Sequence, residues 1–113
     1  MALIFHMCRQ TEWDQARARG TYPGSSQDQA DGFIHFSTTA QIVESARKHR
    51  AGQTDLVVLA VKAEVLGDAL KWESSRSGAL FPHLYGPLQV SAVLWARPLP
   101  LGDDGIHLMP PLN

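Results

Sequence analysis

Histidines are the residues of this sequence whose types and positions best suit chemistry. His6, His35 and His83 lie within or beside short apolar stretches, whereas His49 and His107 lie in polar surroundings and are expected to be solvated. Burying an imidazole is costly unless its ring nitrogens find partners, and histidine titrates near neutral pH. Each of the first three is therefore either a packed, hydrogen-bonded histidine or an acid or base of a site.

Metal binding and nucleophilic catalysis are poorly supported by the spacing of the ligand-type residues. Zinc sites use four His, Cys or carboxylate ligands, usually at short spacings. No two histidines are two or four residues apart, and the single cysteine, Cys8, forms no C-x-x-C pair. We expect Ser37 to cap a helix and Cys8 to pack in the core, and no G-x-S-x-G motif occurs. The sequence thus predicts neither a metal site nor a serine or cysteine hydrolase.

An anion or nucleotide pocket agrees better with the residues near His35 and His83. Ser37 and Thr38 follow His35 at a predicted helix start, where backbone amides attract anions. Arginine binds phosphate with two parallel hydrogen bonds, aromatic rings stack on flat ligands, and a carboxylate at a strand end can orient a histidine. The residues that we assign to these tasks are Arg76, Tyr22, Tyr85 and Glu73. We predict that the side chains of His35 and His83 approach within about 10 Å, from strand and sheet spacings.

Length and charge favour one ordinary globular domain. The 113 residues include 10 basic and 11 acidic side chains, a balance that argues against broad binding to nucleic acid or to a membrane surface. A lone cysteine excludes an intrachain disulfide, and no apolar run approaches the roughly 20 residues that span a bilayer. We therefore expect a single cytoplasmic domain over residues 1–113, as a monomer or weak homodimer whose partner is a small molecule.

The elements expected to position these residues are about five strands and two helices, which predicts an α+β domain. Polar, turn-rich segments at 21–30 and 74–78 are expected to be exposed loops, and a proline-rich tail from about residue 98 to be irregular. One helix is expected from Thr11 to Gly20 and another from Thr38 to Gly52. The strands are predicted at Ala2–Cys8, Gly32–Phe36, Asp55–Val61, Ala69–Glu73 and Leu88–Arg97.

Three motifs in this order resemble the domain of unknown function 952 family. They are Ile4-Phe5-His6, then Gly32-Phe33-Ile34-His35-x-Ser37, then Phe81-Pro82-His83-Leu84-Tyr85-Gly86-Pro87-Leu88, and the resemblance covers residues 3 to about 98. That family is similar in fold to the ADP-ribosyltransferase superfamily, whose members cleave NAD. The resemblance therefore implies a bent, split β-sheet with a cleft for NAD or an ADP-ribose-like ligand.

The resemblance also implies roles for single residues. In that superfamily a first-strand histidine contacts the NAD ribose, which matches His6. A strand opening with glycine carries a tyrosine that stacks on nicotinamide, and here His35 stands near that position, one residue off. A later strand carries a glutamate that steers transfer, but the last predicted strand opens Leu88-Gln89-Val90, without an acid.

Two functional hypotheses follow. In the first, a small anionic or nucleotide-like ligand binds in a histidine-lined cleft, with transferase or hydrolase chemistry as the candidate activity. His35, His83 and Glu73 would then be catalytic, and the ligand-binding residues would be His6, Ser37, Thr38, Arg76, Tyr85 and Tyr22. In the second, the chain is a non-catalytic binding or interaction module whose histidines are structural. The missing strand glutamate favours the second.

Overall fold

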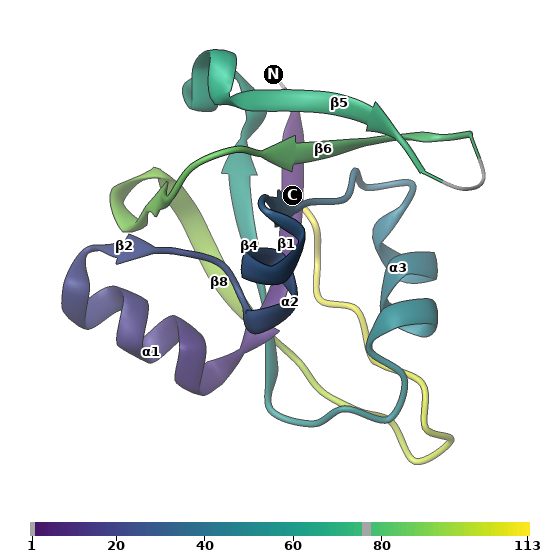
Figure 1. Ribbon diagram of the computed structural model, residues 1–113. Coiled ribbons are helices and arrows are strands. Elements are labelled where there is room, and N and C mark those ends of the chain that lie inside the picture. The colour runs from purple at the N-terminus through teal and green to yellow at the C-terminus, as the bar shows by residue number, and fades with distance from the viewer. Residues whose placement is uncertain (1, 76–77) are drawn as a thin grey trace.

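The computed structural model describes residues 2–75 and 78–113, whose strands form two three-stranded antiparallel sheets and one two-stranded pair (Figure 1). The first sheet has the order β1-β4-β8, with β1 at Leu3–Arg9, β4 at Leu56–Lys62 and β8 at Val93–Leu99. The second has the order β3-β6-β5, with β3 at Ile34–His35, β6 at Leu80–Leu84 and β5 at Leu70–Ser74. The pair joins β2 (Thr21–Tyr22) to β7 (Leu88–Gln89). Together with the helices, these sheets confirm the α+β class.

The central strand of the first sheet, β4, is buried on both faces, which explains its almost continuous apolar sequence, whereas the edge strand β8 alternates half-buried and exposed residues. Side chains alternate along β1, so that Ile4 and Cys8 join one core cluster and Phe5 joins the other. Helix α1 contributes to the first cluster, whereas α3 and the C-terminal tail contribute to the second. In Figure 1, α1 and α3 flank this sheet on opposite sides, and β5 and β6 run crosswise to β1 and β4. Each face of β1 therefore packs into a different core cluster.

Three α-helices occur in the described parts of the chain, where the sequence predicted about two: α1 (Gln10–Arg19), α2 (Ser26–Asp31) and α3 (Ile42–His49). Helix α1 begins earlier than the predicted Thr11 cap, because the Glu12 carboxylate accepts the backbone N–H of Arg9. The second predicted helix starts later than expected, at Ile42, although the Gln41 side chain accepts the N–H of Thr38 as the predicted capping box requires. Two 3₁₀ segments cover Ala63–Ala69 and Val90–Ala92.

Segment 21–30, predicted as an exposed loop, is ordered and partly buried. It contains β2 and most of α2, and its Ser25 and Asp28 side chains are 6% and 3% exposed. Ser25 caps α2: its hydroxyl accepts the N–H of Asp28, and the Asp28 carboxylate accepts the N–H of Ser25. A helix of six residues shows no apolar periodicity, so only this capping box could have indicated it.

The C-terminal part also differs from the prediction. The expected strand 88–97 is divided by a 3₁₀ turn into β7 and β8, and the tail carries an isolated bridge between Leu101 and His107. His107, expected to be solvated, lies with Nε2 2.8 Å from the carbonyl oxygen of Gln53, whereas His49 is exposed as expected. None of the helices in residues 2–75 and 78–113 combines the length and apolarity that crossing a membrane requires.

Candidate functional site

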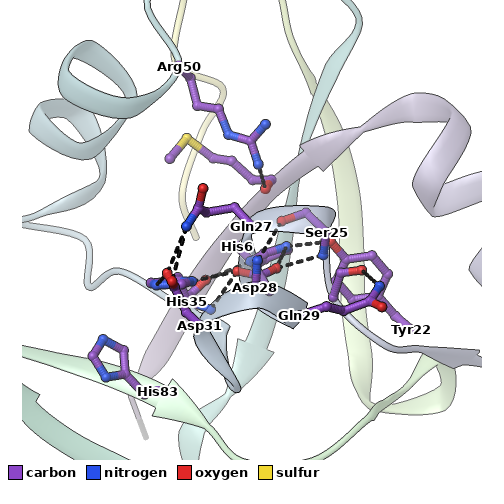
Figure 2. A network of polar contacts seen from close by, with 12 residues as sticks. His6, Tyr22, Ser25, Gln27, Asp28, Gln29, Asp31, His35, Arg50 and His83 are labelled. Carbon is purple, nitrogen blue, oxygen red and sulfur yellow. Dashed lines mark hydrogen bonds and ion pairs between the residues drawn. The ribbon is translucent and has the colours of Figure 1, made fainter.

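A buried carboxylate, Asp28, joins two of the three histidines (Figure 2). Its Oδ1 lies 2.6 Å from Nδ1 of His35 and also accepts the backbone N–H of His35 at 3.2 Å. Its Oδ2 accepts the N–H of Ser25 at 2.8 Å and lies 3.5 Å from Nε2 of His6. Burial raises the pKa of this carboxyl, but the hydrogen bonds and nearby histidines outweigh it and hold the pKa at about 2. Asp28 is therefore an ionised group inside the protein at neutral pH.

His6 is the most enclosed of the histidines. Its Nδ1 lies 2.6 Å from the carbonyl oxygen of His35, which can only accept, so Nδ1 carries a proton. Its Nε2 lies 2.7 Å from the hydroxyl of Tyr22, which donates to a neutral His6. Burial lowers the pKa of His6, although Asp28 opposes that shift. Both ring nitrogens are thus used within the protein, which leaves His6 no free nitrogen for a ligand.

His35 and His83 face each other across two neighbouring strands. They form a register pair between β3 and β6, and their ring centroids are 5.5 Å apart in an edge arrangement. The predicted approach of these two side chains is therefore confirmed. Nε2 of His35 lies 3.1 Å from a carboxylate oxygen of Asp31, a residue that Gln27 also contacts (Figure 2). The side chains of His35 and Asp31 are 40% and 38% exposed, so solvent reaches this contact.

His83 is held by a carboxylate on one side and by an aromatic ring on the other. Its Nδ1 donates to Glu73 Oε1 at 2.8 Å, and that oxygen also accepts the hydroxyl of Tyr85 at 2.7 Å. The hydrogen bond from Tyr85, and then that from His83, lowers the pKa of Glu73. The ring of Phe33 stacks on His83 at 4.1 Å and 22°. No residue in the described parts of the chain bonds Nε2 of His83, so this nitrogen is available to a ligand.

The structure brings together the predicted residues His6, Tyr22, His35, Glu73, His83 and Tyr85, but not Ser37 and Thr38. The hydroxyl of Ser37 donates to Ser45 of α3, and its N–H donates to the carbonyl of Phe5. Arg76 lies outside the described residues. Tyr22 was expected in an exposed loop but is 1% exposed. Its ring packs in the core, and its hydroxyl donates to Nε2 of His6.

Sequence reasoning missed Asp28 and Phe33. Asp28 was hidden in a polar segment, and the capping box Ser25-x-x-Asp28 was the only signal for it. Phe33 contacts His35, His83 and Tyr85 at centroid distances of 4.6, 4.1 and 5.2 Å, which makes it the aromatic centre of the group.

Within residues 2–75 and 78–113 no three His, Cys, Asp or Glu side chains are grouped as metal ligands. Burial raises the pKa of the Cys8 thiol to about 12, which leaves it unreactive.

Two hollows lie beside this group. The larger, about 500 Å³, lies between α1 and the segment from Tyr22 to Gln29. The smaller, about 250 Å³, is lined by Asp28 and Phe33 and by parts of β3, β6 and their flanking loops. Neither is lined by His35 or His83 themselves. The histidine pair therefore sits on a partly exposed face next to the hollows.

The fold and this face define an α+β domain that carries two neighbouring histidines, each oriented by its own carboxylate. The chain belongs to the family described as "Protein of unknown function (DUF952)", whose model matches residues 7–96. The matched range includes His35, His83, Asp28 and Glu73. The family resemblance read from the three motifs is thereby confirmed.

Solved structures of a relative from Caulobacter crescentus, protein CC0527, have the same fold. Its crystal structure is 52% identical in sequence with a TM-score of 0.90, and the match covers 94% of this chain and 93% of that one. Its solution NMR structure is 53% identical with a TM-score of 0.84, and covers 94% and 91%. No functionally curated protein matches the chain.

Proposed function

We propose that this protein binds a small nucleotide-like ligand of the NAD or ADP-ribose class over the face of His35 and His83. In the proposal these two histidines act as acid and base in a transferase or hydrolase reaction. The observation that carries it is the pairing of two partly exposed imidazoles 5.5 Å apart, each fixed by its own carboxylate. Two imidazoles that share one face and are each held by a carboxylate can supply an acid and a base to the same ligand.

The proposed roles follow from which ring nitrogen is free. Glu73 holds the Nδ1 proton of His83, so Nε2 is an acceptor that can take a proton from water or from a ligand hydroxyl. Asp28 holds His35 in the same way, and its second nitrogen faces Asp31. With protons on both ring nitrogens, His35 would donate its Nε2 proton to a ligand that displaces the exposed Asp31 carboxylate, while its Nδ1 proton stays on the hydrogen bond to Asp28. Phe33 and Tyr85 offer ring faces for a flat group.

An ADP-ribosyltransferase-like scaffold is the finer part of the proposal. What supports it is the crosswise arrangement of the two sheets and the position of His6 on β1, directly behind His35. Strand β7, Leu88–Gln89, carries no acid, and the carboxylate that holds His83 comes from β5 as Glu73. Fold similarity is an associational argument for function, so the ligand must be tested directly.

The alternative is a non-catalytic module with structural histidines. The observation that favours it is the full use of His6, whose two nitrogens bond Tyr22 and the His35 carbonyl inside the core. If His35 and His83 served the same purpose, replacing them would change stability and leave any ligand response untouched.

The test is a thermal-shift titration with NAD, ADP-ribose, simple nucleotides and inorganic phosphate. A ligand at one hundred times its dissociation constant adds about 2.7 kcal/mol to the unfolding free energy, which is several degrees of melting temperature here. His83→Ala should abolish the shift, and His49→Ala, which alters an exposed histidine on α3, should leave it unchanged. If every compound at millimolar concentration leaves the melting temperature unmoved, the proposal fails and the structural alternative stands.

A further inference from the structure

The larger hollow is polar and lies outside the histidine face. Eight residues line its volume of about 500 Å³: Glu12, Gln15, Arg19, Tyr22, Pro23, Gly24, Ser26 and Gln29. Most of these residues carry hydroxyl, amide, carboxylate or guanidinium groups, and Arg19 is the one cation among them. A concave surface with this lining suits a hydroxyl-rich, anionic ligand better than an apolar one.

One wall is a polar strip along α1. Glu12, Gln15 and Arg19 are spaced by three and four residues and therefore share one helix face, distinct from the buried Trp13 and Ala16. Glu12 and Arg19 are seven positions apart, which corresponds to about 10 Å along the helix axis. The acid and the guanidinium are thus held at opposite ends of the hollow, with the Gln15 amide between them.

The polar groups of this lining have unused bonding capacity. In the described parts of the chain, the side chains of Gln15, Arg19 and Ser26 have no hydrogen-bond or ion-pair partner. Gln29 uses its amide nitrogen on the carbonyl of Gly24, which leaves its amide oxygen, and Glu12 uses one oxygen on the N–H of Arg9. Donors and acceptors of several kinds therefore remain for a ligand in the hollow.

The opposite wall is fixed by close packing at Gly24. Its φ is +98°, and a Cβ there would lie 2.7 Å from Cβ of Asp28, so the loop rests directly on the residue that orients His35. Pro23 and Gln29 also line the smaller hollow, whose other residues include Asp28 and Phe33. The two hollows thus share one wall and lead from α1 toward the aromatic centre of the histidine face.

We propose that the hollow between α1 and α2 binds the sugar-phosphate part of the ligand, with Arg19 contacting the phosphate and Glu12, Gln15 and Gln29 contacting sugar hydroxyls. Arginine is suited to the phosphate because its fork makes two parallel charge-assisted hydrogen bonds, while carboxylate and amide oxygens accept from hydroxyls. The inference rests on the proposed function for the other end of the ligand, which would lie over Phe33 and His83.

The test is an NMR titration of the full chain with ribose 5-phosphate, with ribose and inorganic phosphate as separate probes. We expect ribose 5-phosphate to shift the backbone amides of residues 12–19 and 24–29 with saturation. Arg19→Gln should weaken its binding about tenfold or more, as expected for loss of a charge-assisted contact. Arg17→Gln is the matched control, because it removes the same charge from the same last turn of α1 without lining the hollow. Its affinity should stay within about twofold of the wild type.

The outcomes separate this inference from the proposed function. Saturable shifts at residues 12–29 that Arg19→Gln weakens support the hollow, even if no NAD-class ligand affects His83. If ADP-ribose shifts only the amide resonances of the histidine face and binds Arg19→Gln with unchanged affinity, the inference about the hollow is overturned and the proposed function stands. Equal affinity for inorganic phosphate and ribose 5-phosphate, or no saturable shift at all, also overturns it.

Discussion

His6 and His83 differ in how many of their ring nitrogens the fold uses. His6 is 3% exposed, with its nitrogens on Tyr22 and on the His35 carbonyl. His83 has one nitrogen on Glu73, and its second is unbonded by any residue in the described parts of the chain. Both come from strands with apolar neighbours, so the role of each is decided by its tertiary partners. The region around His6 is therefore closed by contacts within the fold, whereas the region around His83 keeps one ring nitrogen without a partner in the described parts of the chain.

Asp28 connects the two regions. It contacts His6 on one side and His35 on the other, and His35 in turn meets His83. Asp28 is ionised and 3% exposed, and its contacts with the ring and the backbone N–H of His35 fix the orientation of that residue. The buried residues His6 and Asp28 therefore hold the backbone and ring of His35 in place on the partly exposed face.

The largest expected effect is that of His6→Ala on stability. The change removes a buried ring and leaves the Tyr22 hydroxyl and the His35 carbonyl without their partner. Losing buried volume and leaving polar groups unsatisfied should together cost about 3–5 kcal/mol of unfolding free energy. Urea unfolding of both proteins at pH 7 measures this. A cost below about 1 kcal/mol, the range of exposed substitutions, would show that His6 does not hold the enclosed region together.

The next effect is that of Asp28→Asn, and it depends on pH. The folded-state pKa of about 2 lies below the ordinary value of 3.8, so the unfolded chain binds more protons between these values. The carboxylate therefore stabilises the fold fully above about pH 5, and this contribution disappears as pH falls toward 2. The shift corresponds to about 2 kcal/mol at pH 7.

Urea unfolding at neutral and strongly acidic pH checks this expectation. The difference between wild type and Asp28→Asn should shrink toward zero at about pH 2. Asp31→Asn, which alters the exposed partner of His35, is the control and should cost less than about 1 kcal/mol at pH 7. If the unfolding free energies of wild type and Asp28→Asn differed by the same amount at both pH values, the substitution would have removed a packing contribution and not a charge contribution.

Strands β1 and β4 of the first sheet could be predicted because their signal is local. The run from Leu56 to Val61 is apolar at every position, which indicates burial on both faces, and the structure agrees to within a residue. The closeness of His35 and His83 also followed from sequence, since both stand out from apolar neighbours. The register that makes them direct cross-strand partners is a tertiary result.

The rest of the site depends on contacts between distant residues. In the sequence, Asp28 resembles a solvated loop carboxylate. Only in the folded protein do its contacts with His6 and His35 reveal that it is buried. Pro82 hid the middle strand β6, because proline usually ends strands. Here its missing N–H does no harm to the pairing with β3, since its carbonyl accepts the N–H of Phe36.

The smallest expected effect on stability is that of His83→Ala, and it tests the open side of the comparison. Its ring is 13% exposed and rests on Phe33, and its hydrogen bond goes to a partly exposed carboxylate that Tyr85 also contacts. Water can replace that hydrogen bond, so the change should cost about 1 kcal/mol or less. Urea unfolding of His83→Ala beside His6→Ala measures the contrast, with His49→Ala as the baseline for an exposed histidine. If His83→Ala lowered the unfolding free energy as much as His6→Ala, His83 would be a structural residue and not the base of the proposed site.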